Sequence, residues 1–332
     1  MVNVSKPPLL SICIPTYNRA DCLQGGLEKV IPQAKKYGIP IYISDNASTD
    51  NTEIIVKSCQ KKYPNIIYLK RSKNYGATIN IAKVLRMSKT KYSWLLGDDD
   101  RLTKNAIVEM LKILELNNYD MVVVNGGKKV RASAEKVRGR VSDLYESSAY
   151  SDRNKLLADL GWHMTWMSCL IFSSKMIREG RFEAFFDIHV PHFAVIFDYL
   201  SQGNKAVYWE AKPFIYGSSR DLSNWRDKAF EVFGRMWIDA VKELPADYTL
   251  EAKNACIKNH GIKGRLFSPI TLIILRLLGY YDLSVYRESE SHFARLTNLP
   301  KSIMWMIAII PVPKVISHIL RKLVVFMRRG RN

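Results

Sequence analysis

Hydrophobic and polar positions follow a regular order along the first third of the chain. Short runs rich in Ile, Leu, Val and aromatic residues predict strands, and the stretches between them, with apolar residues every three to four positions, predict helices. The strands are expected at residues 9–14, 39–44, 66–69, 92–96 and 121–124, and the helices at 20–36, 50–62, 77–87 and 103–116. Single helices between successive strands are typical of a mostly parallel sheet with helices on both faces. The pattern therefore predicts an α/β domain of the nucleotide-binding type over residues 1–125.

The middle of the chain has a different pattern. Residues 126–140 are basic and poor in large apolar side chains, which predicts a mobile loop. Residues 150–220 are rich in aromatic residues, most of which we expect in a core. Residues 225–262 are typical of helices.

The end of the chain mixes apolar and basic residues. No Asp or Glu follows Glu290, whereas eight Lys and Arg do, and the whole chain carries a formal net charge of +19. Residues 315–327 place Val, Ile and Leu on one helical face and Lys and Arg on the other, which is typical of a helix lying in a membrane interface. The apolar stretches 266–278 and 303–310 are shorter than the roughly 20 residues that span a bilayer. We therefore expect the C-terminal region to associate peripherally with an anionic membrane surface; the alternative is a helix packed on the protein's own core.

Other features favour a cytoplasmic protein. The five cysteines are scattered and odd in number, which indicates a reducing compartment and argues against a zinc site. The first residues show neither the basic start nor the small-residue cleavage site of a secretory signal. The basic excess would also suit nucleic acid, but the sequence shows no known nucleic-acid-binding module, so we expect no nucleic-acid partner.

Polar residues stand where the predicted strands end. The first strand ends in the sequence PTYNR instead of a glycine-rich GxGxxG turn, which argues strongly against a dinucleotide cofactor. Asp45 ends the second strand and suits either a hydrogen bond to a base or ribose, or a local Asx turn. The fourth strand leads into Gly97 and then Asp98, Asp99 and Asp100. Three adjacent carboxylates repel one another unless a hard cation such as Mg²⁺ or Mn²⁺ binds them, so a solvent-facing metal site is favoured over a plain acidic turn.

Four segments, taken in order, carry a family resemblance. They are PTYNR, SDNASTDNT, NYG with Asn80, and LLGDDD. Together they resemble family 2 glycosyltransferases of the GT-A fold, and more narrowly the bacterial sugar transferases, abequosyltransferase-like members included, that build O-antigen and other surface polysaccharides. The match is dense over residues 9–116 and traceable to about residue 224.

The resemblance implies a nucleotide-sugar donor and assigns its binding residues. Pro15, Tyr17 and Asp45 would hold the nucleoside, with Tyr17 beside the base and Asp45 on its edge. Asn74 and Gly76 would shape the floor of the nucleotide pocket.

The resemblance also implies a divalent metal, Mn²⁺ or Mg²⁺, as cofactor. Asp98, Asp99 and Asp100 cover the metal motif: Asp100 would ligate the metal, and Asp99 either the ribose or the same metal. The commoner family pattern has Asp where this chain has Gly97, which leaves open which carboxylates touch the sugar and which the metal. Arg220 would bind the donor diphosphate from a loop.

The catalytic base is less clearly marked. The family usually places a Glu-Asp pair about ninety residues beyond the metal motif, and here that register falls on Pro191 and His192, so the pair is absent. His192 is our first candidate because imidazole has a suitable ordinary pKa, and Asp187 is the second. Asp198 and His189 compete with them.

The implied activity is the metal-assisted transfer of a sugar from the nucleotide donor to a lipid-linked saccharide at the cytoplasmic face of the inner membrane.

 The transfer would invert the configuration of the donor sugar's anomeric carbon and would serve surface-polysaccharide (O-antigen-like) synthesis. Residues 1–125 would form the donor-binding half and 126–224 the acceptor half of one GT-A domain, followed by a helical basic region at 225–332. Trp162 and Trp166 lie where the acceptor site would begin, and suit either sugar stacking or the core. The alternatives are a nucleotidyltransferase acting on sugar phosphates, which lacks its glycine-rich loop here, and an inactive membrane- or saccharide-binding relative.

Overall fold

The computed structural model describes residues 8–116, 118–129, 137–141, 143–187, 190–217 and 228–329, with side chains up to residue 323. The chain divides into two compact units. The first comprises residues 1–153 and 163–218, and the second comprises residues 154–162 and 219–332. Each unit is described by itself.

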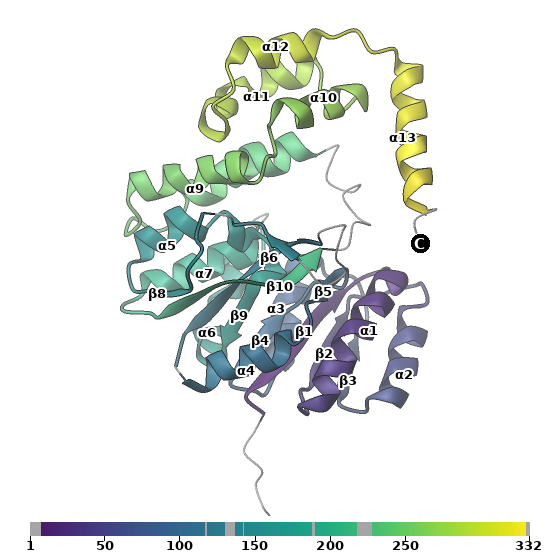
Figure 1. Cartoon of the computed structure of the whole chain (residues 1–332), viewed down its shortest axis with the longest axis vertical. Helices are drawn as coiled ribbons and strands as arrows, with labels where there is room; N and C mark the ends of the chain where they lie inside the picture. Colours follow the sequence, from purple (N-terminus) through teal and green to yellow (C-terminus); the bar gives the residue numbers. More distant parts are fainter. Residues whose placement is uncertain are drawn as a thin grey trace, which may run out of the picture. The chain divides into compact units, whose positions relative to one another are not determined.

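The first unit is built on one mixed sheet (Figure 1). Its main path runs in the order β3-β2-β1-β4-β9-β6-β10-β5, with β7 beside β6 and β8 beside β10. The strands are β1 (Leu10–Thr16), β2 (Ile41–Asp45), β3 (Ile66–Lys70), β4 (Tyr92–Leu95), β5 (Asp100–Leu102), β6 (Met121–Lys129), β7 (Val137–Gly139), β8 (Ser148–Tyr150), β9 (Leu170–Ser173) and β10 (Val207–Gly217).

The N-terminal part of this sheet confirms the predicted pattern. Strands β3, β2, β1 and β4 pair in parallel, and β1 and β2 are completely buried. The connecting helices are α1 (Ala20–Lys36), α2 (Thr52–Lys62), α3 (Ala77–Met87) and α4 (Ala106–Leu116). The strand order steps one way through α1 and α2 and the other way through α3, so right-handed crossovers place α3 on the opposite face from α1 and α2.

The second half of the sheet corrects the prediction of a mostly parallel arrangement. β9 lies antiparallel between β4 and β6, and β5 lies antiparallel to β10. The prediction of a mobile loop over residues 126–140 is also wrong at both ends. Residues 126–129 continue β6, and Val137–Gly139 form β7, which pairs with β6. The side chains of these residues are too polar to predict a strand, but their backbone N–H and C=O groups form hydrogen bonds with a partner strand, which stabilises the extended conformation. Short helices complete this unit: α6 (Ser174–Glu179), α7 (Pro191–Ser201) and single 3₁₀ turns at His163–Thr165, Met167–Cys169 and Phe182–Phe185.

The second unit is helical. It contains most of α5 (Arg153–Leu160), a π-helical turn at Glu231–Met236, α8 (Trp237–Lys242), α9 (Leu250–Lys263), α10 (Pro269–Leu277), α11 (Leu283–Leu296), α12 (Lys301–Ile309) and α13 (Lys314–Arg329). Its core includes stacked and edge-on rings: the Phe230 centroid lies 5.1 Å from Tyr281, 5.5 Å from Phe267 and 5.8 Å from Phe293. These aromatic contacts add to the apolar burial that holds the helices together.

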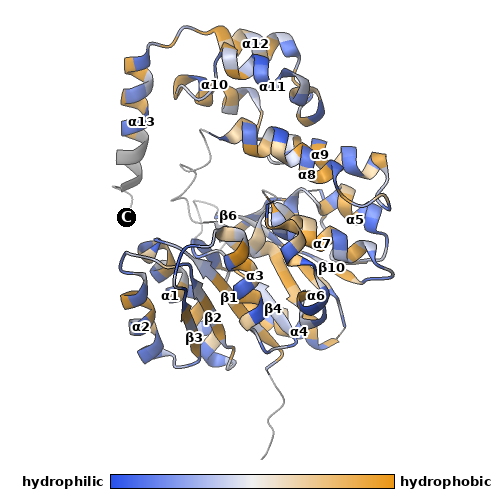
Figure 2. Cartoon of the chain, turned by 180° about the vertical axis from the view of Figure 1, so that it is seen from behind, coloured by the Kyte–Doolittle hydropathy of each residue, from blue (hydrophilic) through white to orange (hydrophobic). Residues whose placement is uncertain are grey.

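Helices α12 and α13 bear on the membrane prediction. Within the described residues no single helix is long and apolar enough to span a bilayer, although Lys301–Ile309 and Lys314–Leu323 would pass that test together despite a bend of 97° between them. α13 alternates hydrophobic and hydrophilic positions (Figure 2). The amphipathic helix is therefore present, while its binding to a membrane stays a prediction.

Candidate functional site

The site lies where the strand order of the first unit reverses. β1 is flanked by β2, which follows it in the chain, and by β4, which comes later. In sheets of this kind ligands bind outside the carboxyl ends of the strands at such a reversal. Thr16 ends β1, and Leu96 to Asp99 follow β4, so the topology brings the PTYNR and GDDD segments to one edge.

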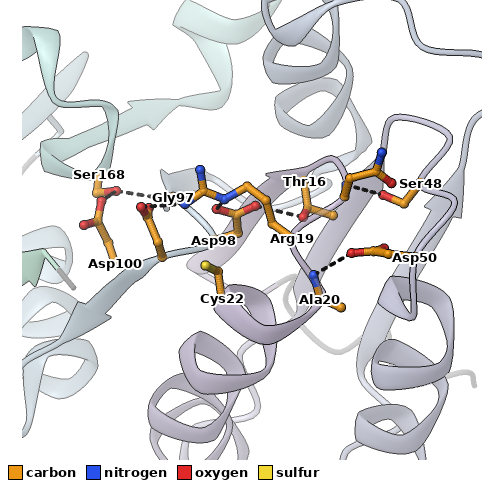
Figure 3. Close-up of polar contacts among 12 residues, drawn as sticks. Thr16, Arg19, Ala20, Cys22, Ser48, Asp50, Gly97, Asp98, Asp100 and Ser168 are labelled. Carbon is orange, nitrogen blue, oxygen red and sulfur yellow. Dashed lines mark hydrogen bonds and ion pairs between the residues drawn. The ribbon is translucent and has the colours of Figure 1, made fainter. Parts of the chain in front are cut away.

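Arg19 joins two of the three adjacent carboxylates (Figure 3). Its Nε lies 3.0 Å from Asp98 Oδ1 and its Nη2 lies 2.6 Å from Asp99 Oδ2. Thr16 Oγ1 donates a hydrogen bond of 2.8 Å to the other oxygen of Asp98. The side chain of Asp98 is 8% exposed, whereas those of Asp99 and Arg19 are both 29% exposed. The guanidinium therefore offsets the repulsion between Asp98 and Asp99.

Asp100 has different partners. Its Oδ2 accepts a hydrogen bond of 2.6 Å from Trp166 Nε1 and another from the hydroxyl of Ser168, which in turn accepts one of 2.8 Å from Gly97 N. Burial and the neighbouring Asp99 raise the pKa of Asp100 to about 7. The expectation of a solvent-facing cluster is thus wrong for Asp98 and Asp100, both of which are buried. Hydrogen bonds from Thr16, Trp166 and Ser168 replace water around them.

The residues present fit a divalent cation that takes further ligands from outside the protein. Asp99 Oδ1 and Asp100 Oδ1 accept no hydrogen bond from the described residues. A Cβ atom at Gly97 would lie 3.3 Å from Asp99 Oδ1 and 3.0 Å from Asp100 Oδ2, so glycine keeps the space between these carboxylates open. No group of three or more His, Cys, Asp or Glu in the described part of the chain is arranged to hold an ion by itself. Mg²⁺ and its analogues commonly take one or two protein carboxylates and complete their shell with substrate phosphates and water.

Asp45 is more enclosed than the sequence suggested. It is fully buried, and its two oxygens accept hydrogen bonds from Ser48 N at 2.8 Å and from Tyr68 Oη at 2.5 Å. Burial and the Asp45 carboxylate raise the pKa of Tyr68. The bond to Ser48 N closes a local turn, which is the alternative that the sequence left open. A nucleoside that binds Asp45 would either share the carboxylate with Tyr68 or displace it.

The predicted floor of the pocket is a hydrogen-bonded loop. Asn74 Oδ1 accepts hydrogen bonds from Asn46 Nδ2 at 2.6 Å and from Gly76 N at 2.8 Å, and Asn46 Oδ1 accepts one from Tyr75 N at 3.0 Å. Gly76 precedes α3 with φ +87°, a value that a side chain would strain. Asn74 and Gly76 thus lie together beside the end of β2, while their part in a nucleotide pocket stays a prediction. Asn46 is a member of this loop that the sequence analysis did not single out.

The structure describes all but one of the other predicted donor and acceptor residues. Pro15 is buried within β1, and Tyr17, just beyond the strand, is 41% exposed. Arg220 lies outside the described residues. Of the two tryptophans, Trp162 belongs to the second unit and is fully buried, and Trp166 is half-buried and donates a hydrogen bond to Asp100.

The two candidate bases have contrasting surroundings. His192 is buried in the first turn of α7, its Nε2 lies 3.3 Å from the Thr165 carbonyl oxygen, and burial lowers its pKa to about 4. Such an imidazole holds a proton poorly at neutral pH, which is unfavourable for a general base. Asp187 is exposed and makes no hydrogen bond or ion pair with the described residues. Asp198 pairs with Arg181, and His189 lies outside the described residues.

Arg19, Ser168 and Trp166 give the carboxylates their surroundings, and the sequence assigned none of them to that task. Arg19 was visible in the PTYNR segment but had no stated role. Ser168 and Trp166 lie 68 and 66 residues from Asp100 in the chain. No local signal marks them, because their position depends on β9 entering the sheet beside β4.

Sequence comparisons relate this chain to known proteins. The model of the family described as glycosyl transferase family 2 matches residues 11–181, which is more than half of the chain. Abequosyltransferase RfbV of Salmonella typhimurium is 27% identical over 87% of this chain and 89% of its own. The poly(ribitol-phosphate) beta-N-acetylglucosaminyltransferase TarP of Staphylococcus aureus is 27% identical over 42% of this chain and 45% of its own, so the chain spans less than half of that relative.

Solved structures share the fold at low sequence identity. The mannosyltransferase PcManGT from Pyrobaculum calidifontis, in complex with GDP-Man and Mn²⁺, is 14% identical with a TM-score of 0.54, over 91% of this chain and 79% of its own. Residues 1–349 of S. aureus TarS, in complex with UDP-GlcNAc, are 14% identical with a TM-score of 0.55, over 95% and 92%. The sheet topology, the family motifs and these matches lead to one conclusion: the chain belongs to glycosyl transferase family 2 and has a GT-A-like α/β fold.

Proposed function

We propose that this glycosyltransferase moves one sugar from a nucleotide-sugar donor to a lipid-linked saccharide in surface-polysaccharide synthesis. The observation that carries the proposal is the meeting of Arg19, Asp98 and Asp99 at the reversal of strand order. Support for the donor class comes from the structural neighbours, which were crystallised with GDP-Man and UDP-GlcNAc. Support for the pathway comes from the likeness to abequosyltransferase RfbV over nearly the whole chain.

Different residues of the chain would bind the metal and accept the proton in this reaction. Asp99 and Asp100 would hold Mn²⁺ or Mg²⁺, which, when bound, neutralises charge on the diphosphate. The bond between the anomeric carbon and the phosphate oxygen breaks, and its electron pair leaves with the diphosphate. The acceptor hydroxyl attacks the opposite face of the sugar and passes its proton to a base. Because His192 is buried, the exposed carboxylate of Asp187 is the better supported candidate for that base.

Donor binding and hydrolysis test the proposal. Purified protein is screened by thermal shift against nucleotide-sugars carrying different bases, with Mn²⁺ or with a chelator, because a ligand that binds the folded state raises its melting temperature. We expect one class of donor to stabilise the wild type only with metal, and Asp99→Asn to abolish the shift. Glu53→Gln is the matched control, since Glu53 is a carboxylate of the same unit paired with Lys57 and Lys70. A wild type that neither binds nor hydrolyses any donor would contradict the proposal.

We also propose that the second unit docks on the cytoplasmic face of the plasma membrane as a peripheral protein. Three helices expose apolar side chains: Ile270, Ile273, Ile274 and Leu277 on α10; Trp305, Met306 and Ile309 on α12; and Val315, Ile316, Ile319 and Leu323 on α13. Arg276 Nε donates a hydrogen bond of 2.8 Å to Ile310 O, and the Arg321 guanidinium lies 4.9 Å from the Tyr280 ring centroid, so these helices are tied together. The absence of acidic residues beyond Glu290 makes the surface suited to anionic lipid.

Vesicle flotation with phosphatidylglycerol tests the docking. Ile270 on α10 and Leu250 on α9 are 71% and 68% exposed, so they form a matched pair. We expect Ile270→Glu and Ile319→Glu to weaken binding about tenfold and Leu250→Glu to leave it unchanged, with high salt weakening the wild type. Equal effects of all three substitutions, or a wild type that does not float, would refute this part of the proposal.

A further inference from the structure

Arg19 occupies the carboxylates that a metal and a donor would need. Its Nη2 lies 2.6 Å from Asp99 Oδ2, and its Nε lies 3.0 Å from Asp98 Oδ1. A divalent cation at Asp99 would bring two positive charges beside this guanidinium. A cation and a guanidinium bound to the same carboxylate repel each other, so the contact between Arg19 and Asp99 competes with metal binding.

The two ends of this bridge differ in how firmly they are held. Asp98 is 8% exposed, and its second oxygen is held by Thr16 Oγ1 at 2.8 Å. Asp99 is 29% exposed, and its other oxygen accepts no hydrogen bond from the described residues. Arg19 Nε contacts Asp98 as an ion pair without hydrogen-bond geometry, whereas Nη2 donates a hydrogen bond to Asp99. The buried Asp98 carboxylate, which Thr16 holds in place, therefore anchors the guanidinium by its charge while the outer end exchanges partners.

We infer that Arg19 is a mobile counter-cation of the donor site. Before the donor arrives it pairs with Asp98 and Asp99. When metal and donor enter, Asp98 retains the Nε end, and the Nη2 end moves from Asp99 to the diphosphate. This inference rests on the proposed function, because it requires a diphosphate-bearing donor.

The chemistry of the guanidinium suits both positions. Its planar fork of N–H donors matches carboxylate and phosphate oxygens equally well, and it stays protonated at any working pH. In the second position it would stabilise the negative charge that the diphosphate gains as the bond to the sugar breaks. Arg19 lies three residues beyond the end of β1 and directly before α1, so it already lies at the edge where the ligand would bind.

Two affinities with opposite expected changes test the inference. The probes are Mn²⁺ alone, followed by electron paramagnetic resonance of the free ion, and inorganic pyrophosphate with saturating Mn²⁺, followed by calorimetry. In Arg19→Gln we expect Mn²⁺ alone to bind several-fold more tightly, because the competing cation is gone. We expect pyrophosphate to bind about tenfold more weakly, because a charge-assisted contact is lost. Arg19→Lys keeps the charge but loses the fork, and should leave Mn²⁺ affinity near the wild-type value while weakening pyrophosphate less.

The controls separate this inference from the proposed function. Arg86→Gln removes an arginine of the same unit that pairs with Glu183 at the end of α3, and should change neither affinity. A wild type that binds neither probe would overturn the proposed donor site and the inference with it. A wild type that binds both, with pyrophosphate affinity unchanged in Arg19→Gln, would overturn the inference alone. Loss of both affinities in Arg19→Gln, with both retained in Arg19→Lys, would indicate a structural role and also overturn it.

Discussion

Ser168 offers a direct test of how Asp100 is held. Its hydroxyl accepts a hydrogen bond of 2.8 Å from Gly97 N and donates one to Asp100 Oδ2, and the residue is fully buried. Ser168→Ala removes both contacts with one atom and leaves the backbone unchanged. Because the residue is fully buried, we expect no water to replace the hydroxyl.

The expected cost follows from these two contacts. A hydrogen bond to a charged group contributes about 1.5–3 kcal/mol, and a buried N–H left without a partner costs about 1–3 kcal/mol. Because one hydroxyl serves both and the site relaxes partly, we expect Ser168→Ala to lower the free energy of unfolding by about 3 kcal/mol. Ser173→Ala is the comparison, since Ser173 only caps α6 through a 3.1 Å bond from Met176 N and should cost about 1 kcal/mol.

The measurement is equilibrium unfolding in urea at pH 8, above the pKa of about 7 for Asp100, so that the carboxylate is charged. Hydrogen exchange of peptides from β1 and β4 reports on the unit that holds the site, independently of the helical unit. A loss below about 0.5 kcal/mol for Ser168→Ala, or a smaller loss than for Ser173→Ala, would refute the bridging arrangement.

Three other substitutions have defined outcomes. Asp100→Asn keeps an acceptor for Trp166 but removes the charge, so sugar transfer should fall about a hundredfold or more while thermal unfolding changes little; near-normal turnover would contradict the metal assignment. The lowered pKa of His192, about 4, means that the unfolded chain takes up a proton before the folded one, so stability present above pH 6.5 is lost as pH falls toward 4. Between pH 7 and pH 5, the free energy of unfolding of His192→Gln, measured in urea titrations, should therefore fall by about 2 kcal/mol less than that of the wild type. The same dependence on pH in both proteins would count against the buried imidazole. A Cβ at Gly126 would lie 2.6 Å from Trp166 Cζ3, so Gly126→Ala should cost about 1–3 kcal/mol, whereas Gly234→Ala, with nothing within 4 Å, should cost none; equal melting temperatures would contradict this packing.

Local patterns in the sequence determined the elements of residues 1–125. The helices at Ala20–Lys36 and Ala77–Met87 were predicted to the residue, and the strands of β1 to β4 to within two residues at either end. Periodicity is a local property, because the apolar face of a helix or a strand is formed by residues only two to four positions apart in the chain. The same patterns identified the strand ends, and with them the PTYNR and GDDD segments, as the place for a site.

Only the tertiary structure decided what surrounds the carboxylates. Arg19 reaches Asp99 across 80 residues, and Ser168 reaches Asp100 across 68. The sequence predicts that Asp98 and Asp100 face solvent and makes His192 the first candidate for the catalytic base, whereas all three are buried. Burial and partner choice depend on which segments meet, and here β9 entering antiparallel beside β4 brings Ser168 and Trp166 to the site. A carboxylate's pKa and its freedom to bind a metal are set by those distant partners, so they cannot be read from its neighbours in the chain.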